Sequence, residues 1–183
     1  MDESRIAQLG EEILRGLMRE VKDVDDPEVQ AVVTDLLESV GPAKGVGIAA
    51  NQLRSDWRIF VMASKPNERY PYAPEMEPLA LINPEIVAHS EETEKDWEGC
   101  LSVGRINGVS AIRGLVPRWV WVDVAYTTVD GKREERRFEG FLARIFQHEI
   151  DHLNGLVYLD RVESNKDLYS HQVFEKLIAN RTL

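Results

Sequence analysis

The segment 140–154 has the periodicity of an amphipathic helix, and the apolar face of that helix carries ionisable side chains. The residues of one stripe are spaced three or four apart and are Phe141, Ile145, His148 and His152. Glu149 falls on the adjacent stripe, and Gly155 follows at a position typical of a helix end. We therefore predict a buried helix that presents two imidazoles and one carboxylate on the same side.

Two histidines four residues apart project from one side of a helix and can bind a single metal ion. His148, Glu149 and His152 form the pattern H-E-x-x-H, in which the carboxylate takes a proton from water at the ion. The alternative is an ordinary helix with polar residues, but their place on the apolar stripe favours a metal site. Asp151 is then either a hydrogen-bond partner of a ligand histidine or an ion-paired surface acid.

A catalytic metal site usually has a third protein ligand and an open position for water. Downstream of His152 the candidates are Glu163, His171 and Glu175, but the extension H-x-x-G-x-x-H of some peptidases is absent. Upstream, the segment EGCLS contains Cys100, the one thiol of the chain. A thiolate with two imidazoles suits Zn²⁺ or Fe²⁺. A lone cysteine is also common as a small buried apolar residue, so the residues alone leave the third ligand open.

A glycine-rich segment, GVGIAANQ, spans residues 45–52. Its first six residues fit a dinucleotide-binding pattern, but that pattern requires a strand before it, whereas here a predicted helix precedes it. We therefore exclude dinucleotide binding. The glycines can instead let the backbone approach a ligand closely. The side-chain amide of Gln52 can donate a hydrogen bond to a developing oxyanion.

The rest of the chain predicts an α+β fold in one domain over residues 1–183. A first helix is expected at 27–39, capped by Asp26, and a last one at 167–178. The expected strands are 58–62, 79–82, 119–129 and 133–138, the last two joined by a hairpin turn at Asp130-Gly131.

The net charge of −10 argues against nucleic acid or an anionic membrane surface as a partner, because both require a basic surface. No stretch is long and apolar enough to span a bilayer, and the acidic N-terminal residues do not have the pattern of a secretory signal. A single cysteine forms no internal disulfide. We expect a cytoplasmic protein.

Three segments, GVGIAANQ, EGCLS and QHEIDHLNG, occur in that order, and together they closely resemble the motifs of peptide deformylases. The segments LINPEI and RGLVPR are also similar to that family, so the resemblance covers nearly the whole chain. It implies short antiparallel sheets packed around a central helix that carries HEIDH, with one helix near each end of the chain.

The resemblance also implies roles for individual residues. The implied ligands of one divalent ion are Cys100, His148 and His152, with water as the fourth ligand. Glu149 would be the general acid and base, and the Gln52 side chain and the Leu101 N–H would donate to the oxyanion. The residues implied for binding the substrate peptide and its methionine are Val46, Gly47, Glu98, Gly99, Phe141 and Ile145.

The implied reaction removes the formyl group from the N-terminal formyl-methionine of nascent chains and releases formate, which is compatible with a place near the ribosome. Fe²⁺ is the implied native ion, and Zn²⁺, Ni²⁺ or Co²⁺ could occupy the same site. The alternatives are an H-E-x-x-H metallopeptidase and a non-catalytic binding module on the same scaffold.

The long 103–112 loop departs from the family pattern and is expected to reshape the mouth of the site, whereas the proline-rich segment 64–78 is expected to be a surface excursion.

Overall fold

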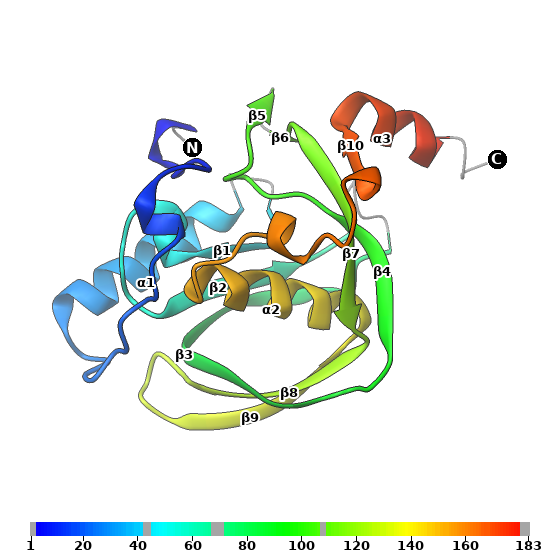
Figure 1. Ribbon diagram of the computed structural model, residues 1–183. Coiled ribbons are helices and arrows are strands. Elements are labelled where there is room, and N and C mark those ends of the chain that lie inside the picture. The colour runs from blue at the N-terminus through cyan, green and yellow to red at the C-terminus, as the bar shows by residue number, and fades with distance from the viewer. Residues whose placement is uncertain (1–2, 42–44, 67–71, 107–108, 180–183) are drawn as a thin grey trace.

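The computed structural model describes residues 3–41, 45–66, 72–106 and 109–179. Within these ranges the chain forms three α-helices and ten strands, joined by several short 3-10 helices (Figure 1). All strand pairs in the sheets are antiparallel, and helices do not alternate with strands along the chain. The predicted α+β class is therefore confirmed.

The larger sheet pairs its strands in the order β1–β2–β3–β8–β9. These strands are β1 (Gly47–Ala49), β2 (Ile59–Ser64), β3 (Met76–His89), β8 (Trp121–Thr127) and β9 (Arg133–Glu139). The turn between β8 and β9 is closed by a hydrogen bond from Gly131 N to Thr128 O at 3.0 Å, which confirms the predicted hairpin.

Helix α1 (Pro27–Val40) packs against one face of this sheet. Its start follows from the sequence, because Asp26 Oδ1 accepts a hydrogen bond from Glu28 N at 2.8 Å and proline occupies the first turn. The helix ends one residue beyond the predicted boundary at Ser39. Its buried side chains form a core with β1, β2 and β3.

Helix α2 (Gly140–Leu153) packs against the opposite face of the same sheet. Alternate side chains of a strand point to opposite faces. Accordingly, Ile59 and Val61 of β2 belong to the core with α1, whereas Phe60 and Met62 belong to the core with α2. In Figure 1, α2 lies at the centre of the molecule, with α1 to one side and β4 and β7 to the other.

The smaller sheet has the order β10–β7–β4. Its strands are β4 (Thr93–Glu98), β7 (Ile112–Trp119) and β10 (Leu168–Ser170), and the last leads directly into α3 (His171–Ala179). Two short strands, β5 (Arg105–Ile106) and β6 (Val109–Ser110), pair with each other in antiparallel fashion. They lie between β4 and β7 in the chain. None of the described helices has the length and apolar character needed to cross a lipid bilayer.

Two strand predictions were wrong in extent. The predicted strand 79–82 is the middle of the much longer β3, which contains Pro78 and Pro84. Proline is unusual inside a paired strand, but the pairing with β8 shifts register between Ile82 and Glu85, and this irregularity accommodates Pro84. The predicted strand 119–129 belongs to two strands, because Trp119 ends β7 and β8 begins two residues later.

Three further expectations are corrected or only partly described. The last helix starts at His171 and not at residue 167, because residues 168–170 pair with β7. The expected loop 103–112 contains the β5–β6 hairpin, and residues 107–108 lie outside the described residues. Residues 67–71 of the proline-rich segment 64–78 also lie outside the described residues. Tyr72 is 96% exposed, in agreement with a surface excursion. The end of the segment, however, belongs to β3.

Candidate metal centre and active site

Three potential metal ligands converge where the end of β4 meets α2. Cys100 lies two residues beyond β4, and His148 and His152 lie one turn apart on α2. The Cys100 sulfur and one nitrogen of each imidazole all lie within 4.8 Å of one another. Cys100 Sγ is 3.2 Å from His152 Nε2, and both residues are buried. This spacing allows one ion to contact all three side chains.

The thiol of Cys100 is surrounded by donors from the protein. Gln52 Nε2 and the backbone N of Ser102 each lie 3.4 Å from Sγ. Burial opposes ionisation of the thiol, but His152 and His148 outweigh it and hold the pKa of Cys100 well below its usual range. The side chain is therefore suited to the thiolate form that binds metals.

Gln52 is held in one orientation by the short 3-10 helix Ala50–Leu53. Its Oε1 accepts a hydrogen bond from Ala49 N at 2.9 Å, and this leaves the amide nitrogen facing the site. That nitrogen donates to Ser102 Oγ at 3.1 Å as well as to the Cys100 sulfur. An amide donor is thus positioned beside the ligand atoms before any substrate binds.

Glu98 orients His148 from behind. His148 Nδ1 lies 2.8 Å from Glu98 Oε2, so a proton on Nδ1 leaves Nε2 free to bind an ion. The same carboxylate accepts two hydrogen bonds from Arg118, at 2.8 and 3.0 Å, and one from Arg144, at 3.1 Å. Burial opposes the charge on Glu98, but Arg118 and His148 more than offset it and lower the pKa of Glu98 strongly.

Asp151 extends this buried network and does not contact a histidine. It accepts hydrogen bonds from Arg118, at 2.6 Å, and from Arg161, at 2.7 Å. Burial raises its pKa, but the contacts with Arg161 and Arg118 lower it further than burial raises it. Both sequence interpretations of Asp151 are corrected: it is ion-paired but buried, and the partner of the histidine is Glu98.

Glu149 has different surroundings. Its Oε2 is buried and has no hydrogen-bond partner among the residues that the structure describes. Burial raises its pKa to about 7, although His148 and His152 act in the opposite direction. A carboxyl group with that pKa can both accept and donate a proton near neutral pH.

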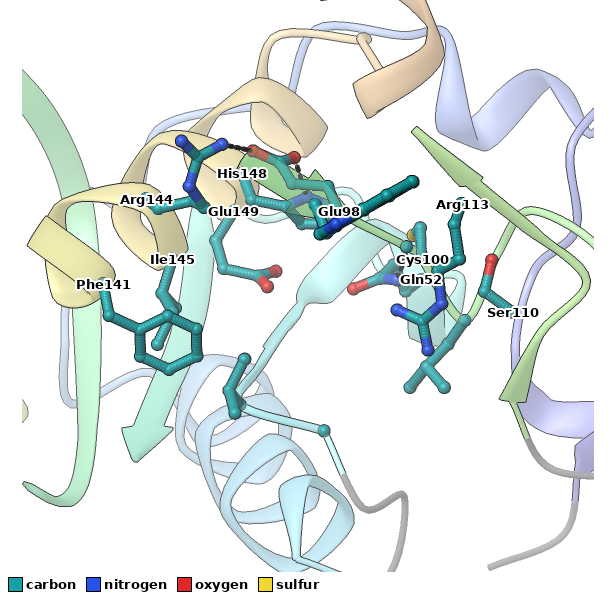
Figure 2. A pocket seen from close by; sticks show the side chains of 16 residues that line it. Gln52, Glu98, Cys100, Ser110, Arg113, Phe141, Arg144, Ile145, His148 and Glu149 are labelled. Carbon is teal, nitrogen blue, oxygen red and sulfur yellow. Dashed lines mark hydrogen bonds and ion pairs between the residues drawn. The ribbon is translucent and has the colours of Figure 1, made fainter. Parts of the chain in front are cut away.

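One pocket contains nearly all the residues predicted from the sequence (Figure 2). Those that line it are Val46, Gly47, Gln52, Glu98, Gly99, Cys100, Leu101, Phe141, Ile145, His148 and Glu149. In Figure 2 the Glu149 carboxylate points into the space between Phe141 and Ile145 on one side and Arg113 on the other. His152 is fully buried behind the lining.

The sequence profile of the polypeptide deformylase family matches residues 3–167. The chain belongs to this family. Peptide deformylases are enzymes that remove the N-formyl group from newly made polypeptides, and they bind one metal ion. The present chain is therefore a deformylase with a Cys100–His148–His152 group that could hold that ion.

Individual relatives of this deformylase agree with the match. Peptide deformylase 2 of Nostoc sp. is 46% identical over 177 residues, which is 97% of this chain and 96% of the relative. Peptide deformylase 2 of Shewanella oneidensis is 46% identical over 85% of this chain and 82% of the relative. Among solved structures, the class I type b peptide deformylase of Acinetobacter baumannii bound to Met-Ala-Ser has a TM-score of 0.79 and 39% identity; the match covers 86% of this chain and 96% of that one.

The downstream candidates for a third ligand have partners elsewhere in the deformylase fold. Glu163 Oε2 lies 3.1 Å from Lys95 Nζ, and His171 Nε2 lies 3.1 Å from Glu175 Oε1 on α3. Neither pair belongs to the group of side chains that includes Cys100.

Four side chains that line the deformylase pocket were not predicted from the sequence, namely Trp97, Ser110, Arg113 and Arg144. Arg144 could have been found, because a basic residue on the predicted buried face, one turn before His148, needs a buried acidic partner. The other three come from strands that reach the pocket only through the tertiary fold. Arg113 begins the family-like segment RGLVPR, but that resemblance assigned it no role.

Proposed function

We propose that this deformylase binds one divalent ion through Cys100, His148 and His152 and hydrolyses the formamide of N-formyl-methionyl peptides. The observation that carries the assignment is the convergence of three ligand atoms within 4.8 Å beside Glu149, whose Oε2 has no partner in the described part of the chain. A thiolate and two neutral imidazoles form a suitable donor set for a catalytic divalent ion. When bound, such an ion polarises the formyl carbonyl and makes a nearby water more acidic.

Glu149 is the proposed general base and general acid. It takes a proton from the attacking water and passes that proton to the departing amine of methionine. The pKa of about 7, raised by burial, matches both halves of this transfer. The free amine and formate are the products.

Gln52 and Leu101 are the proposed oxyanion donors. The Gln52 amide nitrogen is already aimed at the site by the hydrogen bond between Oε1 and Ala49 N. Leu101 directly follows the ligand Cys100, and the proposed donor is its backbone N–H. Two fixed donors next to the ion stabilise negative charge that develops on the formyl oxygen.

The substrate peptide is proposed to extend between the segments around Gly47 and Gly99, which both line the pocket. Val46, Phe141 and Ile145 supply the apolar surface for the methionine side chain. Glu98, which was grouped with the substrate-binding residues on sequence grounds, is better suited to orient His148 than to contact the peptide.

Fe²⁺ is the proposed native ion, and Zn²⁺, Ni²⁺ or Co²⁺ are proposed to fit the same ligands. Ligand type alone does not select among these ions in a cell. A ferrous site with a thiolate ligand is sensitive to oxidation. Iron-loaded protein should therefore lose activity on aeration while nickel-loaded protein retains it, and equal survival of the two forms would contradict the iron assignment.

We place the enzyme in the cytoplasm, close to the ribosomes that supply formylated chains, and treat residues 1–183 as one deformylase domain. The net charge of −10 favours recognition of the peptide and not of ribosomal RNA.

The decisive experiment measures formate release from formyl-Met-Ala-Ser by protein purified without oxygen. We expect turnover by the wild type and a loss of about 10²–10⁴-fold in Glu149→Gln with the metal content unchanged. Absence of formate from folded, metal-loaded wild-type protein would overturn the assignment in favour of a non-catalytic module. Cleavage of internal peptide bonds in unformylated substrates would instead favour a metallopeptidase.

A further inference from the structure

Arg113 of β7 is a buried cation that lacks a counter-ion among the described residues. It is 2% exposed, and its Nε and Nη2 have no hydrogen-bond partner there. Two other buried arginines beside the site are fully engaged, because Arg118 binds Glu98 and Asp151, and Arg144 binds Glu98. The difference is notable because an unpaired buried charge costs several kcal/mol.

The fold reserves space for this guanidinium at the pocket wall. A Cβ at Gly99 would lie 2.4 Å from Arg113 Nη1, so the Arg113 side chain lies directly over this glycine, which precedes Cys100 in the sequence. On its other side, the guanidinium carbon is 4.9 Å from the centre of the Phe174 ring. In Figure 2 the Arg113 guanidinium lies across the open space from Phe141 and Glu149. It therefore lines the pocket as a fixed element and does not extend into solvent.

A second unpaired donor belongs to the same wall. Trp97 lines the pocket, and its Nε1 is buried without an acceptor among the described residues. Its ring also packs on Phe174, with the ring centres 5.1 Å apart. Trp97 and Arg113 are thus lining residues that keep buried N–H groups without acceptors among the described residues, whereas Glu149, across the pocket from Arg113 in Figure 2, keeps an unpartnered acceptor, Oε2.

Unused donors with a net positive charge require an acceptor that carries negative charge. A neutral carbonyl could satisfy the indole N–H, but it would leave the guanidinium without a counter-charge. The contact with Phe174 is weaker than an ion pair to a planar carboxylate, which can accept two guanidinium hydrogen bonds at once.

We propose that Arg113, assisted by Trp97, is a carboxylate-binding residue at the wall of the pocket. The two candidate sources of the carboxylate are an acidic side chain shortly after methionine in the peptide and formate, the product. The inference rests on the proposed function for the nature of these ligands. In the first case, Arg113 makes the enzyme distinguish acidic peptides from isosteric neutral ones. In the second case, Arg113 keeps the product formate bound.

The peptide arm compares formyl-Met-Asp-Ala-amide with formyl-Met-Asn-Ala-amide, and formyl-Met-Ala-Asp-amide with formyl-Met-Ala-Asn-amide. The C-terminal amide removes every carboxylate except the one under test. For the wild type we expect kcat/KM to favour aspartate by about tenfold at one of the two positions, expressed mainly in KM. Arg113→Met should bring the ratio near one, and Arg113→Lys should retain part of it. Arg133→Met, which removes the same charge from a surface ion pair with Glu85, should leave the ratio unchanged.

The product arm measures how strongly formate inhibits turnover of the neutral peptides. Weaker inhibition in Arg113→Met with an unchanged aspartate-to-asparagine ratio identifies formate as the ligand. A wild-type ratio near one at both positions, together with equal formate inhibition in wild type and Arg113→Met, overturns the proposal.

Two controls keep this test separate from that of the function itself. Calorimetric binding of the unformylated Met-Asp-Ala and Met-Asn-Ala amides gives the same ratio without turnover, so an inactive preparation still tests Arg113. If Arg113→Met does not fold, Arg113→Lys supplies the comparison. If Arg113→Lys then binds the peptides and formate as the wild type does, the result counts against carboxylate recognition by a guanidinium.

Discussion

Gly47 and Glu149 are in such close contact that a Cβ at position 47 would fall 2.4 Å from Glu149 Oε1. The backbone of β1 therefore determines where the carboxylate lies, and the glycine reserves the space that it occupies. This contact also joins the proposed peptide-binding segment to the proposed proton carrier, since both belong to one wall of the pocket.

Gly47→Ala should therefore displace the Glu149 carboxylate. We expect kcat for formyl-Met-Ala-Ser to fall by about 10²-fold, because a misplacement of about 1 Å can have that effect, with metal content unchanged. Gly41→Ala is the matched control, since a Cβ there meets nothing within 4 Å, and it should retain wild-type kcat. Steady-state kinetics on metal-loaded protein decides the matter, and normal kcat in Gly47→Ala would show that the carboxylate is free to shift.

Glu98→Gln should weaken metal binding although Glu98 is not a ligand. The amide keeps the shape of the side chain but no longer fixes the proton on His148 Nδ1 as strongly, and it leaves Arg118 and Arg144 without their shared counter-charge. We expect a 10–100-fold loss of zinc affinity in chelator competition and a loss of about 3–5 kcal/mol of stability in urea unfolding. Glu94→Gln, at an exposed position of the same strand, should change neither quantity.

Glu149 should make the metal-free protein less stable as the pH rises. Its pKa is raised from 4.5 to about 7, so the folded state holds this proton more tightly than the unfolded state does. The free energy of unfolding therefore decreases between pH 4.5 and about 7 by about 3 kcal/mol from this group. Glu149→Gln should exceed the wild type in stability by that amount above pH 7 and match it below pH 4.5. Parallel urea-unfolding profiles for the two proteins across this range would refute the assignment.

Cys100→Ser distinguishes the present site from one whose third ligand lies downstream. Loss of a residue that hydrogen-bonds to a metal ligand typically lowers metal affinity about 10–100-fold. We expect a larger loss for Cys100→Ser, which removes a ligand itself, and we expect activity to fall with it. His171→Ala, which removes a downstream candidate in a surface pair with Glu175, should leave both unchanged. Metal analysis after dialysis gives the answer, and retention of the ion by Cys100→Ser would transfer the third ligand to another residue.

The part of the site that could be predicted from the sequence is the part that lies on one regular element. His148, Glu149 and His152 are related by the helical period alone, so their common direction follows from their spacing. Cys100 could be assigned only through the resemblance of three segments, because its distance from the helix depends on how β4 and β7 pack.

What could not be predicted depends on contacts between distant segments. The resemblance grouped Glu98 with Gly99 as substrate-binding residues, and the bond from Glu98 to His148 exists only once β4 lies beside α2. Arg113 begins the family-like segment RGLVPR, but its burial was not predicted, since a strand arginine is ordinarily exposed and its burial results from Gly99 and Phe174. The length of β3 was missed because the register shift that accommodates Pro84 is a property of the paired strands.

The proposed metal ligands come from two separate layers, with Cys100 after the smaller sheet and both histidines on α2, and 52 positions separate Cys100 from His152. During synthesis the chain must be extended past His152 before a three-ligand site can exist. An ion that binds there closes a long loop and favours the folded state over the unfolded one. The supply of metal in the cell should therefore control how fast newly made copies mature and how long they survive proteases, in addition to their rate of catalysis.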